Sequence, residues 1–273
     1  MTNPNPKLAV LILQYNSTDL TIQLLESIEQ FEGYNLSNYR FVLMDNNSQE
    51  PRRTEIEHRF PWLSFVSYED NLGFGRAHNR IMEEIYDEWI LLLNNDCILL
   101  NNAITRTLQD AQKVQADFAT CAVLNQDMTD QTNFSTLPTP LRKVLLNLTG
   151  ITRLLWYIRR KISVTRVGYV NGAFLLIRRA VIPKDQLFDD RYFMYTEDLD
   201  LMFRLAKQQA KGYRLASGRV IHLGGKSAAR KWTGQEINDV KELQAKECMQ
   251  RHFPSWQVNF MVGIYRIVLR HQS

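Results

Sequence analysis

Residues Ile90 to Cys97 read Ile-Leu-Leu-Leu-Asn-Asn-Asp-Cys, so four apolar residues are followed directly by two amides and a carboxylate. A short unbroken apolar run predicts a central strand that is covered on both faces. Asn94, Asn95 and Asp96 fall where this strand ends, and open α/β sheets bind ligands just outside the carboxyl ends of their strands. Mg²⁺ typically takes one or two carboxylates together with substrate phosphates, so Asp96 suits a metal site. An ordinary Asn/Asp turn is the alternative that this stretch alone leaves open.

Strands and helices are expected to alternate along the first half of the chain. Apolar runs of strand length lie at residues 8–13, 41–44, 62–68, 90–94 and 118–124. Apolar residues at helical spacing lie between them, at 20–28, 76–86 and 103–114. This alternation predicts an α/β fold with a mostly parallel sheet flanked by helices. Polar residues gather where the strands end, and we expect them to form one rim: Asn16, Asp45, Asn71 and Asp96.

The composition narrows the class of protein. At 273 residues and 45% hydrophobic, the chain can form one large α/β domain, or one domain with an appendage. A formal net charge of +4 is too small to predict a nucleic-acid partner. The three cysteines lie far apart without a CxxC pair, which favours free thiols in a reducing compartment. Without a signal-peptide pattern or an apolar run of roughly 18 residues, we expect a cytoplasmic protein.

The pattern changes after about Asn125. Residues 127–140 predict a polar loop, and residues 141–166 mix Lys and Arg with aliphatic and aromatic residues and contain no acidic residue. The elements expected after them are a strand at 169–177, a helix at 197–210, short strands at 213–216 and 219–221, and a helix at 235–249. We expect one domain over 7–232, which includes an insertion at 127–166, and a helical extension over 233–273.

Two segments are both basic and apolar, 141–166 and the tail from Trp256 to Arg270. Aromatic and aliphatic groups mixed with Lys and Arg suit the surface of an anionic membrane. This predicts a peripheral attachment to the inner face of the cell membrane. The alternative is a helical lid and a docking helix whose charges are simply solvated.

A pair of acidic residues opens the predicted helix at 197. If Thr196 caps that helix, Asp198 shares a face with apolar residues three, four and seven positions on, and therefore faces the body of the protein. A partly buried carboxylate at the edge of a cleft is a candidate general base. Acidic residues in a first helical turn are also favoured by the helix dipole, which is the alternative explanation. Asp200 aligns with Arg204 on what we predict to be a solvated face.

His222 follows a short predicted strand and precedes a glycine-containing stretch, 223–227, which predicts a mobile loop with Lys226 free to meet an anion. A single histidine is more often packed or exposed than bound to a metal. Neutral imidazole is nevertheless a good ligand for Mn²⁺-type sites that mix nitrogen and oxygen. The chain has neither a GxGxxG fingerprint nor a GxxxxGK[ST] loop.

Seven stretches, in this order, carry a family resemblance: Val10–Asn16, Val42–Ser48, Asn71–Phe74, Leu92–Asp96, Asn171–Arg178, Phe188–Asp200 and His222. Together they resemble the family 2 glycosyltransferases with a GT-A fold, and most of all their bacterial rhamnosyltransferase-like branch. The resemblance implies that residues 7–232 form a GT-A catalytic domain.

The resemblance also implies a role for each site residue. Asp198 matches the catalytic base, and Asp96 and His222 match the ligands of a divalent cation, Mg²⁺ or Mn²⁺. Asn94 stands where the family's DxD-like motif begins, so Asp96 is the only carboxylate of that motif here. Asp45 matches the residue that reads the nucleoside base, and the implied donor-binding set is Gln14, Asn16, Asp45, Asn71, Arg76 and Asn95.

The expected activity is an inverting transfer of a sugar, with rhamnose suggested by the branch, from a dTDP- or UDP-sugar donor. The expected acceptor is a hydroxyl of a growing bacterial surface polysaccharide or a lipid-linked glycan. Two alternatives remain open at this point: a nucleotidyltransferase on a similar core, and a non-catalytic sugar-binding relative that has kept the fold.

Overall fold

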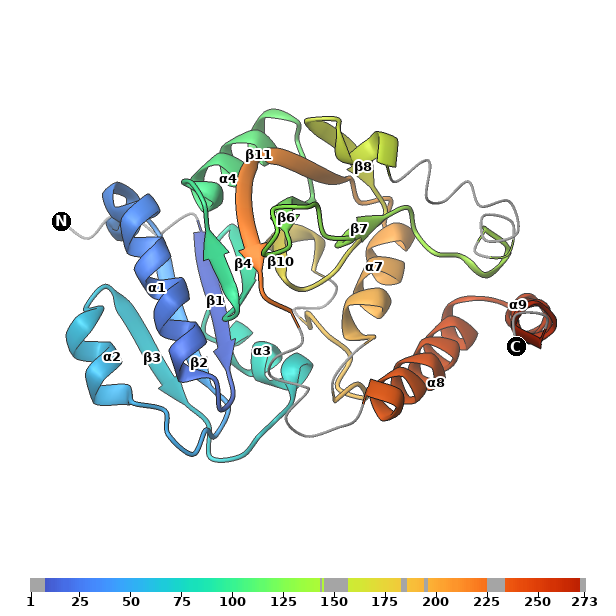
Figure 1. The fold of residues 1–273 in the computed structure, drawn as a ribbon, viewed down its shortest axis with the longest axis horizontal. Coiled ribbons are helices and arrows are strands. Elements are labelled where there is room, and N and C mark those ends of the chain that lie inside the picture. The colour runs from blue at the N-terminus through green and yellow to red at the C-terminus, as the bar shows by residue number, and fades with distance from the viewer. Residues whose placement is uncertain are drawn as a thin grey trace.

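A computed structural model of the chain describes residues 8–142, 144, 157–182, 186–193, 196–224 and 234–270, without the side chains of 234–242 and 265–270. Figure 1 shows a central sheet with helices on both faces and two further helices, α8 and α9, at one side. The α/β fold that the alternating pattern predicts is therefore confirmed.

The N-terminal half forms a parallel sheet. Its apolar runs become four buried strands: β1 (Leu8–Gln14), β2 (Arg40–Asp45), β3 (Leu63–Ser67) and β4 (Trp89–Asn94). The helices between them are α1 (Thr18–Glu32), α2 (Arg53–Arg59) and α3 (Phe74–Met82), with a 3₁₀ turn at Gly33–Asn38. The strands lie in the order β3-β2-β1-β4 and all pair in parallel.

The second half adds strands of both directions. β10 (Phe174–Arg178) pairs antiparallel with both β4 and β6 (Phe118–Leu124), and β11 (Gly212–His222) pairs in parallel with β6. β5 (Cys97–Leu99) and β8 (Val164–Val167) pair antiparallel with β11. Within the described residues the sheet has nine strands, in the order β3-β2-β1-β4-β10-β6-β11-β5 with β8 also beside β11. It is parallel from β3 to β4 and mixed beyond.

Two of the predicted strand boundaries differ from the structure. The strand expected at 169–177 is divided, because β9 (Tyr169–Val170) leaves the main sheet to pair with β7 (Phe134–Ser135). The chain turns between β9 and β10, where the Asn171 side chain accepts a hydrogen bond from the Ala173 N–H. The two short strands expected at 213–216 and 219–221 form one strand, β11, with an irregular register between Arg214 and Arg219.

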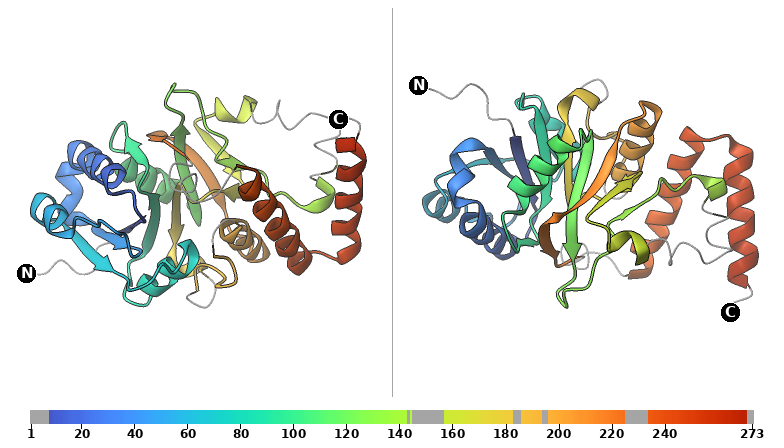
Figure 2. Two further views of the ribbon diagram at one scale, coloured as in Figure 1. Left: turned by 60° about the horizontal axis from the view of Figure 1, so that its bottom comes forward. Right: turned by 90° about the horizontal axis from the view of Figure 1, so that it is seen from above.

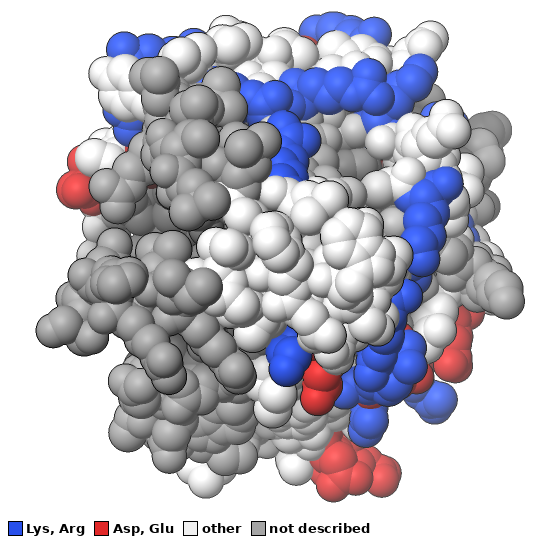
Figure 3. Space-filling model, turned by 90° about the vertical axis from the view of Figure 1, so that its right-hand side faces the viewer, with Lys and Arg blue, Asp and Glu red and all other residues white. Residues whose placement is uncertain are grey.

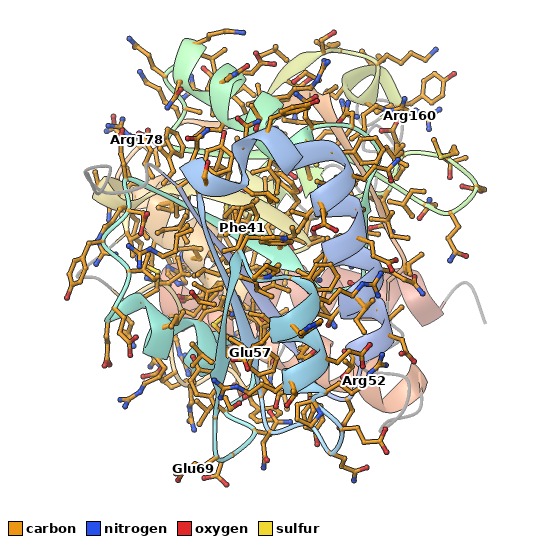
Figure 4. All side chains as sticks on the ribbon, turned by 90° about the vertical axis from the view of Figure 1, so that its left-hand side faces the viewer. Phe41, Arg52, Glu57, Glu69, Arg160 and Arg178 are labelled. Carbon is orange, nitrogen blue, oxygen red and sulfur yellow. The ribbon has the colours of Figure 1, made fainter. Side chains whose placement is uncertain are left out.

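Each face of the sheet is covered by its own helices. One core contains side chains of α1, α2 and α4 (Ala103–Lys113), and the other contains side chains of α3 and α7 (Glu197–Lys207). Figure 4 shows Phe41 of β2 deep among the side chains and Glu69 at the outer edge. Phe41 is 1% exposed and packs edge-on against Trp62, with 5.0 Å between the ring centroids. Fully burying an aromatic side chain of this size contributes roughly 1.5–3 kcal/mol.

A third apolar cluster joins α7 to the C-terminal helices α8 (Gly234–His252) and α9 (Ser255–Arg270). It contains Phe203 of α7, Met249 of α8 and Val258 of α9. Figure 2 shows α8 and α9 at the opposite end of the molecule from α1 and α2. No helix within the described residues is long and apolar enough to span a bilayer.

The prediction that Asp200 lies on a solvated face of α7 is wrong, because α8 covers that face and leaves Asp200 3% exposed. Its predicted pairing with Arg204 is confirmed, with 2.7 Å between Arg204 Nε and Asp200 Oδ2. His252 of α8 lies 2.8 Å from the other carboxylate oxygen. Burial by itself raises the pKa of Asp200, but the hydrogen bond with His252 and the charge of Arg204 outweigh it and lower the pKa.

Parts of two predicted segments lie outside the described residues. These are 143 and 145–156 of the basic insertion, and 225–233 of the glycine-containing stretch, including Lys226. The described end of the insertion contains β8, an edge strand that the sequence pattern did not indicate.

Candidate active site

The topology brings the ends of distant strands to one edge of the sheet. Gln14 at the end of β1 stands opposite Asp45 at the end of β2, and Leu13 stands opposite Asn94 at the end of β4. β10 runs antiparallel to β4, whereas β6 and β11 run in the same direction as β4. The start of β10 and the end of β11, at His222, therefore reach the same edge.

Asp45 is held by neutral donors. Gln14 Nε2 donates to Asp45 Oδ1 at 2.9 Å, and the Ser48 N–H donates to Oδ2 at 3.0 Å. Asn16 is held close by, because its N–H donates to Ser48 Oγ at 2.9 Å and its side-chain oxygen accepts from the Gln49 N–H at 2.8 Å. The buried Gln14 Oε1 has no hydrogen-bond partner within the described residues. It is therefore a buried acceptor that the described residues leave unsatisfied.

The predicted donor-binding residue Asn71 forms part of a tight turn. Its side-chain oxygen accepts from Asn46 Nδ2 at 2.9 Å and from the Gly73 N–H at 3.0 Å. Gly73 has a φ of 81°, and a Cβ there would lie 2.3 Å from the Phe193 carbonyl oxygen. Only glycine fits this close approach. Arg76, exposed in the first turn of α3, donates from Nε to the Asp190 carbonyl at 2.9 Å.

The two adjacent asparagines of the Asn94–Asp96 corner point in different directions. Asn95 is turned inward, where its Nδ2 donates to Ser17 Oγ at 2.7 Å and Thr21 Oγ1 at 2.9 Å at the start of α1. Its amide N–H groups are thus already bonded within the protein. Asn94 Nδ2 instead lies 3.4 Å from His222 Nε2.

Asp96 and His222 are brought together by the pairing of β5 with β11, which sets His222 opposite Cys97. His222 Nε2 lies 3.1 Å from Asp96 Oδ1, and both side chains are nearly buried, at 13% and 8% exposed. The other ring nitrogen, Nδ1, lies 2.8 Å from Gln131 Oε1. The predicted metal ligands therefore do lie side by side.

This pair suits a divalent cation of the Mg²⁺ or Mn²⁺ type. One carboxylate oxygen and one imidazole nitrogen are the mixed donors that Mn²⁺ accepts, and such cations commonly complete their shell with water and substrate phosphates. A trio of His, Cys, Asp or Glu ligand atoms close enough to hold an ion occurs, within the described residues, only at Asp200, Cys248 and His252. That trio is less suitable, because Arg204 already binds Asp200 and burial raises the pKa of Cys248 to about 12.

Asp198 is the second residue of α7, where it is partly buried against β9. Tyr169 donates its hydroxyl to Asp198 Oδ2 at 2.8 Å, and the Leu199 N–H donates to Oδ1 at 2.7 Å. Burial raises the pKa of Asp198, although these hydrogen bonds and one from the Gly172 backbone act in the opposite direction. Burial and the adjacent charge of Asp198 raise the pKa of Glu197 to about 8. Two carboxyl groups buried side by side thus make each other's ionisation harder.

The turn between β9 and β10 connects Asp198 to the end of β4. Gly172 donates from its backbone to Asp198, and the next residue, Ala173, accepts from the Asn94 N–H at 3.0 Å. Only this short turn thus separates the hydrogen-bonding partners of Asp198 from the corner that holds Asp96.

Three residues of the site were not singled out from the sequence: Ser48, Gln131 and Tyr169. Ser48 lies inside a motif that was recognised, so the signal was present. Gln131 lies in what the sequence presents as an ordinary polar loop. Tyr169 precedes the recognised Asn171 motif by two positions and reads as one more strand residue.

The chain belongs to a glycosyltransferase family, because the family model described as "Glycosyltransferase like family 2" matches residues 4–236. It is 26% identical over 208 residues to N-acetylglucosaminyl-diphospho-decaprenol L-rhamnosyltransferase of Mycobacterium tuberculosis, covering 69% of this chain and 68% of the relative. It is 23% identical over 222 residues to rhamnosyltransferase WbbL of Escherichia coli K12, covering 78% and 82%. These relatives confirm the resemblance to the rhamnosyltransferase-like branch.

Solved structures with the same fold are GT-A glycosyltransferases. The mannosyltransferase PcManGT of Pyrobaculum calidifontis, in complex with GDP-Man and Mn²⁺, superimposes with a TM-score of 0.61 at 11% identity, covering 98% of this chain and 76% of that one. TarS of S. aureus gives a TM-score of 0.58 at 16% identity over 80% of this chain. The chain spans 36% of the TarS chain. The predicted GT-A fold is therefore confirmed.

The Glu197–Asp198 pair generates a prediction about stability. The folded-state pKa of Glu197, about 8, lies above the ordinary value of 4.5, so its contribution to stability is complete below pH 4.5 and is lost as pH rises through 8. We expect Glu197→Gln to remove this loss, so that the free energy of unfolding of the variant rises relative to that of the wild type between pH 6 and pH 9. Urea unfolding followed by circular dichroism measures the difference. The exposed Glu84→Gln is the control, and equal pH dependence in wild type and Glu197→Gln would contradict the assignment.

Proposed function

We propose that this protein is a metal-dependent, inverting glycosyltransferase that moves a sugar from a nucleotide-diphosphate sugar to an acceptor hydroxyl. The observation that carries the proposal is the His222–Asp96 pair, 3.1 Å apart at the sheet edge where Asp45 and the turn beside Asp198 also lie. Membership of the family supports the reaction class. A non-catalytic sugar-binding protein would have no use for two desolvated carboxyl groups at such a place.

The donor's nucleoside is proposed to bind at the ends of β1 and β2. Asp45 is fixed there by Gln14 and Ser48, and each carboxylate oxygen keeps a lone pair with which it can accept an N–H of the base. The unpartnered Gln14 Oε1 adds a second acceptor. The Asn71 turn and the Arg76 side chain supply polar and cationic groups for the rest of the donor.

Asp96 and His222 are the residues that would hold the divalent cation. Such a cation stabilises the negative charge that builds on a departing diphosphate, by several kcal/mol. PcManGT, which shares the fold, contains Mn²⁺. The single carboxylate of the pair leaves most of the coordination shell to water and phosphate oxygens.

Asp198 is proposed as the general base. Its carboxylate takes the proton of the acceptor hydroxyl, the acceptor oxygen forms a bond to the anomeric carbon, and the bond from that carbon to the diphosphate breaks. Attack from the side opposite the leaving diphosphate inverts the anomeric centre. Tyr169 and the Leu199 N–H hold the carboxylate in position while it accepts the proton.

The finer assignments rest on the relatives. Both curated relatives named above are rhamnosyltransferases, which supports rhamnose on a dTDP- or UDP-type carrier as the first donor to examine. The name of the mycobacterial relative contains a decaprenol-linked diphospho-sugar, which supports a lipid-linked glycan as the acceptor. No observation on this chain favours a nucleotidyltransferase.

A membrane-bound acceptor is consistent with the surface of the C-terminal side. Within the described residues, exposed apolar side chains lie on two separate segments here: Tyr157, Ile158, Ile162 and Val164 beside the exposed Lys161 and Arg166, and Trp256 and Phe260 on α9. Figure 3 shows on this side of the molecule an uncharged area with Lys and Arg along its upper and right edges. We propose that this surface attaches the protein peripherally to an anionic membrane at the cytoplasmic face.

Replacing the base should abolish transfer without disturbing the fold. Because Asn cannot accept the proton, Asp198→Asn is expected to lower turnover by at least ~10²-fold. The assay measures nucleoside diphosphate release from dTDP-rhamnose and UDP-sugars with a lipid-linked acceptor. Donor binding and the circular dichroism spectrum should stay as in the wild type, and wild-type turnover would remove Asp198 from the role.

Replacing the carboxylate of the metal pair should remove the metal dependence of donor binding. We expect Asp96→Ala to weaken the binding of dTDP or UDP in the presence of Mn²⁺ by at least ~10-fold, since loss of even an indirect ligand contact costs that much. Calorimetric titrations with Mn²⁺ and with EDTA provide the measurement. The exposed Asp127→Ala serves as control, and a donor affinity that chelation does not change in the wild type would count against the site.

Attachment to a membrane can be tested with liposomes. The wild type should sediment with vesicles that contain phosphatidylglycerol, less so as salt is raised, and not with pure phosphatidylcholine. Reversing Lys161 and Arg166 to Glu should weaken binding roughly tenfold or more, at about 1 kcal/mol for each cation lost near the surface. Arg53→Glu on α2, at the far side of the molecule in Figure 1, should bind normally. Absence of binding even to anionic vesicles would reject the proposal.

A further inference from the structure

The loop that follows β6 carries Gln131, whose side chain contacts His222 on the side away from Asp96. Gln131 Nε2 donates to the His222 carbonyl oxygen at 3.0 Å and to Asn125 Oδ1 at 3.1 Å. Its other end, Oε1, lies 2.8 Å from His222 Nδ1. Gln131 therefore hydrogen-bonds with both the backbone and the imidazole of His222.

The orientation of the Gln131 amide is decided by a backbone group. A carbonyl oxygen can only accept, so the atom that faces the His222 carbonyl must be the amide nitrogen. The atom that faces His222 Nδ1 is consequently the amide oxygen, which requires Nδ1 to carry a hydrogen. In the neutral ring the remaining lone pair then lies on Nε2, the nitrogen that faces Asp96.

Gln131 is itself fixed on a rigid base. Its N–H donates to the Val123 carbonyl oxygen at 2.8 Å, which continues the end of β6. The neighbouring Asp130 accepts from Arg214 Nη2 at 2.7 Å, and Arg214 is 2% exposed. A positioning residue needs such support, because a loosely held partner would not fix the orientation of the ring.

We propose that Gln131 is a positioning residue of the cation site: it fixes the His222 tautomer and ring orientation so that the Nε2 lone pair and Asp96 Oδ1 face the same ion. The inference rests on the proposed function, because it presumes that a divalent cation binds this pair. The two ligand atoms lie 3.1 Å apart, a spacing at which one cation can bind both. Gln131 does not touch the ion.

The test measures metal binding rather than turnover. Binding of Mn²⁺ in the presence of UDP is followed by electron paramagnetic resonance, together with the pulsed signal of a directly bound ¹⁴N nucleus. Gln131→Leu keeps most of the side-chain volume but accepts no hydrogen bond from His222. We expect it to weaken Mn²⁺ binding by about 10–100-fold and to reduce the ¹⁴N signal. Gln131→Glu keeps an oxygen for Nδ1–H while losing the donation to the His222 carbonyl, and it should stay within a few-fold of the wild type.

Two controls separate a positioning role from a structural one. Asp127→Ala removes the two hydrogen bonds that the Asp127 carboxylate accepts from Thr129 in the same loop, and it should leave Mn²⁺ binding unchanged. If Gln131→Leu prevents folding, Gln131→Asn takes its place. The Asn side chain is one methylene too short to reach His222 Nδ1, so this variant should weaken Mn²⁺ binding in the same way. A Gln131→Leu protein with wild-type affinity and ¹⁴N signal would overturn the inference. So would Gln131→Glu binding as weakly as Gln131→Leu, because then the whole side chain would merely support the loop.

His222→Ala distinguishes this inference from the proposed function. Loss of Mn²⁺ binding in His222→Ala together with normal binding in Gln131→Leu would overturn the positioning role alone. Equal Mn²⁺ binding in the wild type and His222→Ala, or no binding in the wild type, would overturn both the metal site and the positioning role.

Discussion

The pairing of β11 with β6 and with β5 is the constraint on which the site depends. β6 holds β11 in parallel, and the three-residue strand β5 holds its end antiparallel, so that His222 lies beside Asp96. The strand can follow this path only because it carries glycine where it crosses α4. A Cβ at Gly218 would lie 2.7 Å from the Ala103 carbonyl oxygen and 2.4 Å from Thr107 Oγ1. Asp96 and His222 are thus brought together by backbone hydrogen bonds rather than by long side chains.

The sheet and its polar rim could be predicted because a buried strand must be apolar along its length, as Ile90 to Leu93 are, and a ligand edge must be polar. The partners of individual side chains could not. Asn94 and Asn95 are chemically identical neighbours, yet one faces His222 and the other binds α1. Helical spacing correctly paired Asp200 with Arg204, but spacing within one helix cannot show that a distant helix covers them. Gln131 lies in a polar loop that has no hydrophobic periodicity, so no sequence pattern indicates its contact with His222.

Four aspartates of the site region differ in the groups that surround their carboxylates. Asp45 is held by neutral donors, which leaves its charge available to a ligand. Asp96 faces an imidazole nitrogen 3.1 Å away, which makes the two the proposed ligands of a cation. Asp198 is desolvated beside Glu197, and burial raises the pKa of both carboxyl groups. Asp200 is neutralised by Arg204 and His252 and is thereby confined to structure. The same carboxylate thus stands in four different environments, three of which suit the roles proposed for it and one of which is structural.

Helix α7 connects the candidate active site to the C-terminal helices α8 and α9. Its first turn carries Asp198, one side packs into the core under the sheet through Leu201, and another packs against α8 through Phe203. Because α7 is held on two sides, its first turn has little freedom to move relative to the rim. Asp200 strengthens this restraint, since it is bound within α7 and also across to His252 of α8. A general base must stay within hydrogen-bonding reach of the proton it takes, so the contacts of α7 with the helices beyond the sheet support the position that the proposed role of Asp198 requires.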